Sequence, residues 1–314
     1  MVARNPKVRH LIIGLTAGGV LLAGAPLAVS AVSAVSAVSA EVAPPTVSAK
    51  SAKLLDVNSG ESLYDKAGDS ARPMASTAKI MVAIMVLDTK VDLDTQIEVH
   101  QRYRDYANEH HASTADLQTG DRMTVRQLLY AVLLPSGADA AYALADNLGD
   151  GDTPGERVAS FVGNMNAKSR ELGLSKTHFE TFDGTGNDTS TPEELTRLAR
   201  HAMENPVFRK VVSTKKYKAD APAANGRTRH YTWTNTNKLL GAYPGVIGIK
   251  TGTTKKAGEC LVFAAARGKK TLVGTVLNSD DRFNDVAKLL DYGFGTHDAK
   301  DLELNDTPSA TRQD

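Results

Sequence analysis

The chain has 314 residues, 41% hydrophobic and 23% charged, which is an ordinary composition for a globular protein with its own core. Its formal net charge is +1, and it has no basic stripe interleaved with aromatic residues, so nucleic-acid binding is not expected. Cys260 is the only cysteine, which excludes an internal disulfide, and its apolar neighbours predict a buried, inert thiol.

The first 40 residues have the layout of a secretory leader. Three basic residues precede an apolar run that begins at Leu11, and residues 28–40 repeat the triplet VSA, which offers several small-residue cleavage points. We expect residues 1–40 to be a signal peptide with a low-complexity extension, and the mature chain to be secreted to the extracytoplasmic side. Alternatively the run stays as a membrane anchor, since with its flanks it approaches spanning length.

The first structured elements are predicted to be a hairpin and a buried helix. The hairpin spans residues 49–66. The helix spans residues 73–87, and because its second half is entirely apolar it is expected inside the molecule. Ser76 and Lys79, near its start, are three residues apart and share one helix face. Burying a lysine is unfavourable unless the residue has a function, so the pair is a candidate activated nucleophile. The alternative is a capped core helix whose lysine reaches solvent.

The middle of the chain, residues 90–210, is predicted to be a mostly helical subdomain. It opens with short strands or loops at 92–122. Helices are then predicted from Thr124, over 138–148, over 155–172 and from Thr191, the first and last with capping-box patterns.

Beyond Tyr217 the pattern changes to strands. The β-rich runs are 228–237, 245–254, 259–268 and 270–278, followed by an amphipathic helix from Asp281. Tyr231 and Trp233 are expected to pack on the sheet. Because strands come from both ends of the chain, we predict an α+β fold, in which one antiparallel sheet flanked by helices carries the helical block as an insertion. One domain would span 41–298, and 299–314 would be a frayed tail.

Several other patterns are interpreted as structural. Ser213 to Lys216 repeats the Ser-x-x-Lys pattern, but it lies among lysines and is interpreted as a solvated helix end. His110 and His111 lack metal-ligand spacing, so no metal is expected. Residues 183–187, DGTGN, have too few glycines for a dinucleotide site and predict a turn near a cleft rim.

Two further stretches become informative when they are considered together with Ser76 and Lys79. Ser136 lies between two predicted helices in PSGAD, and Lys250-Thr251-Gly252 ends a strand. In isolation Ser136 would be a helix cap, and the second stretch an edge strand with a protective lysine. In this order, however, Ser-x-x-Lys, Ser-Gly-x and Lys-Thr-Gly resemble the three motifs of the penicillin-binding proteins and serine β-lactamases.

The flanking sequences narrow this resemblance. Four segments resemble the D-alanyl-D-alanine carboxypeptidases, the low-molecular-mass penicillin-binding proteins of peptidase family S11. These segments are PMASTAKIMVAIMVLD, LLPSGADAAYALAD, NTNKLL and GVIGIKTGTTKKAGECLVFAA. The likeness covers about residues 45–295. One departure is Ala138, where most of this family has an asparagine that contacts substrate and the catalytic lysine. Its loss puts the efficiency and the ratio of hydrolysis to transfer in question.

The resemblance implies a role for each motif. Ser76 would be the nucleophile that forms an acyl-enzyme and Lys79 the general base, neutral because burial and the nearby Lys250 both lower its pKa. Ser136 would relay the proton to the leaving nitrogen. Lys250 and Thr251 would hold the terminal carboxylate of the substrate.

The strand after Lys250 would complete the substrate site. Gly252 would let the strand pass close to the substrate backbone. The resemblance also implies an oxyanion hole built from the backbone N–H groups of Ser76 and Thr253.

The resemblance implies a serine D-alanyl-D-alanine carboxypeptidase or transpeptidase that acts on peptidoglycan stem peptides, is inhibited by β-lactams, needs no cofactor and is a monomer. One alternative is a secreted serine β-lactamase, although no Glu-x-x-Leu-Asn segment lies between Ser136 and Lys250 to supply a deacylating base. The other is a non-catalytic penicillin-binding relative, suggested only by Ala138.

Overall fold

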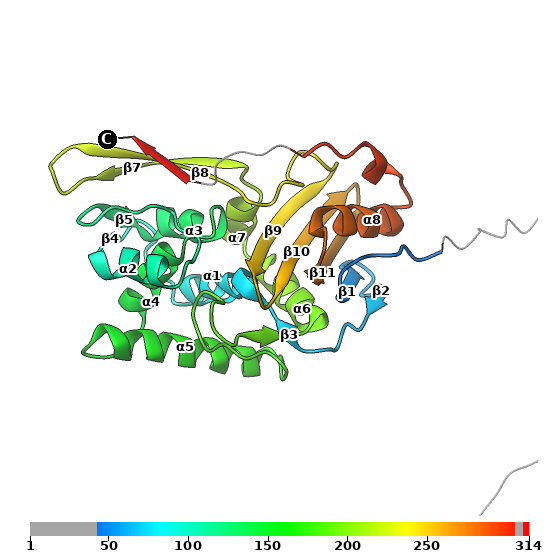
Figure 1. Ribbon diagram of the computed structural model, residues 1–314, viewed down its shortest axis with the longest axis horizontal. Helices are drawn as coiled ribbons and strands as arrows, with labels where there is room; N and C mark the ends of the chain where they lie inside the picture. The colour runs from blue at the N-terminus through cyan, green and yellow to red at the C-terminus, as the bar shows by residue number, and fades with distance from the viewer. Residues whose placement is uncertain (1–42, 305–309, 314) are drawn as a thin grey trace, which may run out of the picture. The chain divides into compact units, whose positions relative to one another are not determined.

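The computed structural model describes residues 43–304 and 310–313. The described residues belong to one compact unit (Figure 1). The leader predicted at 1–40 lies outside the described residues. Within the described part of the chain, no helix is long and apolar enough to cross a membrane.

The main sheet has five antiparallel strands in the order β2-β1-β11-β10-β9. These strands are β1 (Ser51–Asp56), β2 (Ser62–Lys66), β9 (Val246–Thr254), β10 (Gly258–Arg267) and β11 (Lys270–Ser279). The predicted hairpin is therefore present, and its first strand pairs with β11, where Ser51 lies opposite Leu277. Strands from both ends of the chain share one sheet, which confirms the predicted α+β fold. β9 is the edge strand at one end of this sheet.

Helices cover both faces of this sheet (Figure 1). On one face, α8 (Arg282–Phe294) packs against β10 and β11. On the other, α6 (Pro192–Ala202) packs against β11 and β1. α1 (Lys79–Asp88) contacts α6 and is also surrounded by α3 (Val125–Leu133), α4 (Ala138–Leu148) and α5 (Pro154–Glu171). Because its neighbours enclose it, an all-apolar sequence is stable there, as predicted.

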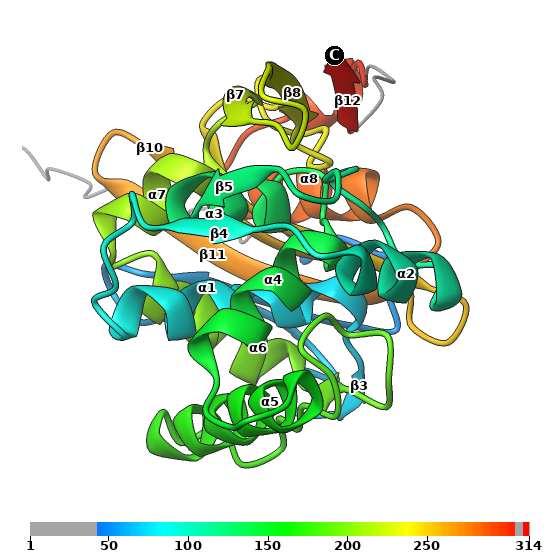
Figure 2. The same ribbon diagram turned by 90° about the vertical axis from the view of Figure 1, so that its left-hand side faces the viewer.

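The remaining helical part lies on the side of the molecule that Figure 2 presents. It contains α2 (Gln101–Glu109), α7 (Pro206–Val212) and the short strands β3 (Arg72–Pro73), β4 (Gln96–Glu98), β5 (Arg122–Thr124) and β6 (Thr189–Ser190). Thr124 caps α3 in a complete capping box, as predicted. Thr191 caps α6, but the carboxylate of Glu194 accepts hydrogen bonds from Lys176 and Thr177 instead of completing the box.

Three predictions about these elements were wrong. The stretch 92–122 contains α2, which a loop interpretation missed because its sequence is very polar and only Tyr103 and Ala107 are buried. The predicted frayed tail contains regular structure in its described part, namely the end of the 3-10 turn η2 (Asp298–Asp301) and β12 (Ala310–Gln313).

The third wrong prediction concerns Tyr231 and Trp233. They lie in a second sheet of β7 (Lys216–Pro222), β8 (Thr228–Thr234) and β12, in the order β12-β8-β7. This sheet runs beside the helical part (Figures 1 and 2). The alternating sequence of β8 predicts a strand but cannot show which sheet it joins.

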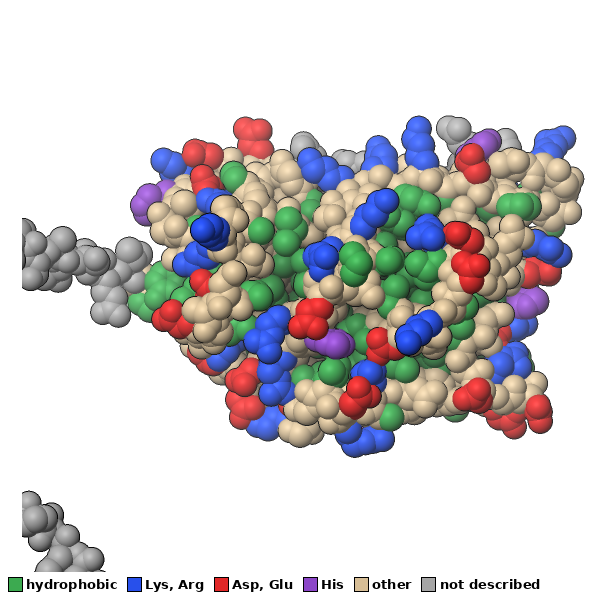
Figure 3. Space-filling view, turned by 180° about the vertical axis from the view of Figure 1, so that it is seen from behind, with side chains coloured by type: hydrophobic (Ala, Val, Ile, Leu, Met, Phe, Trp, Pro, Cys, Tyr) green, Lys and Arg blue, Asp and Glu red, His purple; other side chains and the backbone are tan. Residues whose placement is uncertain are grey.

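The face opposite to that of Figure 1 carries lysine and arginine side chains interspersed with acidic ones (Figure 3). The two signs therefore balance locally as well as in the total charge of +1.

Candidate active site

Ser76 and Lys79 lie in a tight turn that leads into the buried helix. The turn is the 3-10 helix η1 (Ala75–Ala78), and α1 begins at Lys79. The helix predicted from residue 73 therefore starts later, because Pro73 pairs in β3 with β6. In a 3-10 turn residues three apart are eclipsed, so the two side chains still meet. Nζ of Lys79 is 3.0 Å from Oγ of Ser76.

Lys79 is completely buried, and its Nζ also donates a hydrogen bond to the backbone carbonyl of Asp183 at 3.1 Å. Burial lowers the pKa of Lys79, while the carboxylates of Asp183, Asp139 and Asp188 oppose this shift. The alternative of a capped core helix whose lysine reaches solvent is therefore excluded. A lysine with a lowered pKa beside a serine hydroxyl is the arrangement expected for a general base and its nucleophile.

The turn that contains Asp183 packs directly against η1. Asp183 is fully buried, and its Oδ1 accepts hydrogen bonds from the hydroxyls of Tyr106 (3.1 Å) and Thr185 (2.8 Å). Gly184 has a φ of +86°, and a Cβ there would lie 2.0 Å from the carbonyl oxygen of Ala75. Only glycine allows this approach, so the turn supports the backbone of the nucleophile from behind.

Lys250 lies in β9 and is only 1% exposed. Its Nζ donates to the backbone carbonyl of Thr251 at 2.9 Å. Burial holds the pKa of Lys250 well below its usual value, and the positive charges of Lys79 and Arg282 lower it further. The pKa of both lysines is lowered, mainly by burial, as expected for Lys79, and each positive charge disfavours the other. Lys79 has three carboxylates that favour its charge, whereas none acts comparably on Lys250.

Gly252 brings β9 close to the nucleophile. A Cβ on Gly252 would lie 3.0 Å from the backbone nitrogen of Ser76 and 3.0 Å from the carbonyl oxygen of Met74. The absence of a side chain thus allows the contact with η1, and the predicted approach of the strand to substrate stays a prediction. Arg282, the first residue of α8, donates to the carbonyl of Gly252 (2.9 Å) and to Oγ1 of Thr253 (2.6 Å), which holds this end of the strand.

Ser136 lies in the connection between α3 and α4 with a φ of +69°, which is unusual for a residue other than glycine. It is not the cap of α4, because Gly137 occupies that position. Its Oγ is buried and has no hydrogen-bond partner among the described residues. A strained serine with an unused buried hydroxyl is a feature of functional sites more often than of structural ones.

Thr236 links the Ser136 connection to β9. Its backbone N–H and its hydroxyl both contact the carbonyl of Leu134, at 3.1 and 3.2 Å. The same hydroxyl is 2.6 Å from Oγ1 of Thr251. The second and third motifs are therefore joined by one side chain.

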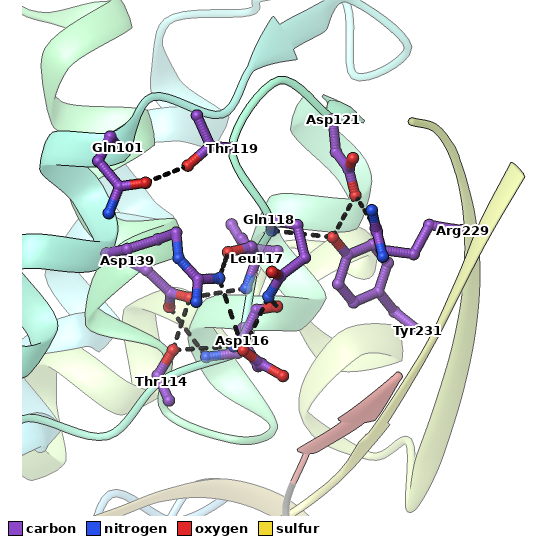
Figure 4. A network of polar contacts seen from close by, with 12 residues as sticks. Gln101, Thr114, Asp116, Leu117, Gln118, Thr119, Asp121, Asp139, Arg229 and Tyr231 are labelled. Atoms are coloured by element: carbon purple, nitrogen blue, oxygen red, sulfur yellow. Dashed lines mark hydrogen bonds and ion pairs between the residues drawn. The ribbon is translucent and has the colours of Figure 1, made fainter. Parts of the chain in front are cut away.

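Asp139 holds the loop that packs on the Ser136 connection (Figure 4). Its carboxylate accepts hydrogen bonds from the hydroxyl of Thr114 (2.7 Å) and from the backbone N–H groups of Ala115 (2.9 Å) and Leu117 (3.0 Å). A Cβ on Gly137 would come within 2.8 Å of the side chain of Ala115. The glycine of the second motif is thus needed for this contact.

The other end of the same loop is tied to the second sheet (Figure 4). Asp121 is fully buried and accepts from Nε of Arg229 (2.7 Å) and from the hydroxyl of Tyr231 (2.5 Å). Nε1 of Trp233 donates to the carbonyl of Ala115 at 2.9 Å. These two aromatic residues therefore position the loop beside Ser136.

The remaining candidates are structural. Cys260 is buried, and burial raises the pKa of its thiol to about 11, as expected for an inert cysteine. Ser213 follows the last turn of α7 and is exposed, which confirms the solvated helix end. Among the residues that the structure describes, no group of three or more histidine, cysteine or acidic side chains could hold a metal ion.

Sequence reasoning missed four residues that organise this site. Asp139, Asp183, Thr236 and Arg282 each contact a motif or its neighbour through a partner distant in the chain. Only Asp139 lies directly beside a motif, so the sequence carried little signal for the other three. Ala138 begins α4 with a buried side chain, so no amide is present where most of the family has asparagine.

Comparisons with known proteins identify the family. The family model of the S11 peptidases, described as D-alanyl-D-alanine carboxypeptidase, matches residues 38–281. A D-alanyl-D-alanine carboxypeptidase of Streptomyces sp. strain K15 is 46% identical over 287 residues, covering 89% of this chain and 96% of that protein. A D-alanyl-D-alanine carboxypeptidase of Mycobacterium tuberculosis is 36% identical over 260 residues, covering 80% and 84%.

Solved structures give the same result. The Streptomyces K15 DD-transpeptidase superposes with a TM-score of 0.79 at 48% identity, covering 81% of this chain and all of that one. The D-alanyl-D-alanine carboxypeptidase of M. tuberculosis superposes with a TM-score of 0.71 at 32% identity, covering 82% and 96%. The chain therefore belongs to the S11 family of serine D-alanyl-D-alanine carboxypeptidases.

Proposed function

We propose that the protein is a serine D-alanyl-D-alanine carboxypeptidase and transpeptidase, which removes or exchanges the terminal D-alanine of peptidoglycan stem peptides through an ester on Ser76. The observation that supports this best is the 3.0 Å approach of a fully buried lysine amine, on Lys79, to the hydroxyl of Ser76. Membership of the S11 family supports the same substrate class.

Acylation would proceed in two proton transfers. Neutral Lys79 takes the proton of Ser76 Oγ as this oxygen attacks the carbonyl carbon between the two D-alanines. As the C–N bond breaks, the unpartnered hydroxyl of Ser136 passes a proton to the leaving nitrogen, and D-alanine departs. Water or an amine then attacks the ester and regenerates Ser76.

Binding of the substrate would also set the charges of the two lysines. We assign Lys250 and Thr251 to the terminal carboxylate, a group that favours the charged form of Lys250 and raises its pKa. A charged Lys250 would in turn lower the pKa of Lys79, which favours the neutral base. The substrate itself would thus reinforce the neutral state of Lys79, which burial already favours.

The oxyanion would be stabilised where β9 meets the nucleophile. The backbone N–H groups of Ser76 and Thr253 are our candidates for the two donors. The close approach of Gly252 to Ser76 supports this assignment, because a side chain at this position would occupy the space beside the donor.

The wider biology follows from the substrate. Peptidoglycan is extracytoplasmic, so we propose a secreted protein, bound to the membrane only if the leader is retained, that works as a monomer without a cofactor. β-Lactams, which mimic the scissile peptide, would leave Ser76 blocked.

The test is to incubate residues 41–314 with a peptide ending in D-Ala-D-Ala and to measure D-alanine release, with Ser76→Ala as control. Release that survives this substitution would rule out the assignment. Covalent labelling by a fluorescent penicillin, absent in Ser76→Ala, distinguishes an enzyme from a non-catalytic relative. Steady nitrocefin turnover would instead favour the β-lactamase alternative.

A further inference from the structure

Two segments that are distant in the chain both pack against η1, the turn that carries the nucleophile. In the turn 183–187, a Cβ on Gly184 would lie 2.0 Å from the carbonyl oxygen of Ala75. At the end of β9, a Cβ on Gly252 would lie 3.0 Å from the backbone nitrogen of Ser76. Because both segments are in close contact with η1, a shift of either one would move Ser76 as well.

One hydrogen bond joins these two segments beyond η1. Nζ of Lys256, in the connection between β9 and β10, donates to Oδ1 of Asn187 at 2.6 Å. The contacts therefore form a closed ring, which runs from η1 through the turn 183–187, across the Lys256–Asn187 bond and back along the end of β9 to η1.

The backbone is fixed at both ends of this bond. The backbone N–H of Asn187 donates to Oε2 of Glu180 at 2.5 Å. The carbonyl of Ala257, the neighbour of Lys256, accepts from Nδ2 of Asn278 at 3.0 Å. Because neither end is free to follow the other, the bond can set the distance between the two segments.

The bond is also easy to open. Lys256 and Asn187 are both exposed, so water competes for the donor and for the acceptor, and such a pair contributes little to the free energy of folding. Its loss should leave the fold intact. The two segments would then be free to separate, and Ser76 would be held less precisely.

We propose that Lys256 and Asn187 form a latch that holds the β9–β10 connection to the turn 183–187 and thereby positions Ser76 for acylation. Both are positioning residues that act through η1. The inference rests on the proposed function, in which Ser76 forms the ester.

The experiment is a double-mutant cycle on the rate of acylation by a fluorescent penicillin. Lys256→Met removes the donor, Asn187→Leu removes the acceptor, and a third protein carries both substitutions. Each single variant should be acylated about fivefold more slowly than the wild type, the upper range for one exposed charged pair. The double variant should be no slower than the single ones, because the second substitution removes no further contact.

Two further variants separate the bond from the charge. Lys255→Met removes the same charge at the adjacent residue, which is exposed and has no side-chain partner among the described residues, and it should acylate like the wild type. Lys256→Arg keeps the donor and should recover most of the rate that Lys256→Met loses. The unfolding free energy, measured by denaturation, should be equal in all these proteins, which separates positioning from a merely structural role.

Three outcomes would overturn the latch: wild-type rates in both single variants, losses that multiply in the double variant, or an equal loss in Lys255→Met. The last two would show that a side chain or a charge acts without the bond. If Ser76→Ala were still labelled by the penicillin, the proposed function would fail instead.

Discussion

Gly184 offers the sharpest test of how the nucleophile is supported. It has a φ of +86°, and an added Cβ would lie 2.0 Å from the carbonyl oxygen and 2.4 Å from the carbonyl carbon of Ala75. Both atoms are backbone, so no flexible side chain can yield. Gly184→Ala must therefore move either the turn or η1, and η1 carries Ser76.

The magnitude follows from two separate costs. A left-handed conformation costs a residue with a Cβ roughly 1–2 kcal/mol. Overpacking against backbone adds about 1–3 kcal/mol. The sum is about 2–5 kcal/mol of unfolding free energy. Gly173→Ala is the matched control, because Gly173 has a φ of +68° with nothing within 4 Å of the added Cβ, and it should lose only the first amount.

The assays are denaturant unfolding and the rate of acylation by a fluorescent penicillin. A displacement of Ser76 by about 1 Å should slow acylation on the order of 100-fold in Gly184→Ala. Gly173→Ala should acylate like the wild type. If the two variants were equally stable and equally fast, the turn around Gly184 would not support the nucleophile as described.

Three further predictions concern carboxylates. Asp183→Asn removes a charge that raises the pKa of Lys79, so the neutral base persists to lower pH and the pH profile of penicillin acylation should shift to the acid side; an unshifted profile would contradict the role. Asp139→Asn should lower the unfolding free energy by about 1.5–3 kcal/mol, measured by denaturation, because the loop donors lose a charged acceptor. Asp285 is buried, which raises its pKa, but its four hydrogen bonds lower that pKa overall. Asp285→Asn should therefore be destabilising at pH 7, and its stability should converge with the wild type as the pH falls below about 4; a constant difference would be evidence against this.

The sequence by itself determined the fold class and the candidate motifs. A helix that is apolar on every side must be buried, and strands with alternating or continuous apolar runs at both ends of a chain favour one shared sheet. Ser76 and Lys79 could be paired from their spacing alone, because three residues bring side chains together in either type of helix. These inferences use only local periodicity, which does not depend on how the rest of the chain folds.

Only the tertiary structure decided what surrounds those motifs. The support of η1 by Gly184, the link of Thr236 to Thr251 and the contacts of Asp139 all join residues distant in sequence. The charge balance of Lys79 and Lys250 also depends on such neighbours, because the carboxylates of Asp183, Asp139 and Asp188 oppose the lowering of the pKa of Lys79. Electrostatic energy depends on distances in space and on burial, and neither is encoded in the spacing of residues along the chain.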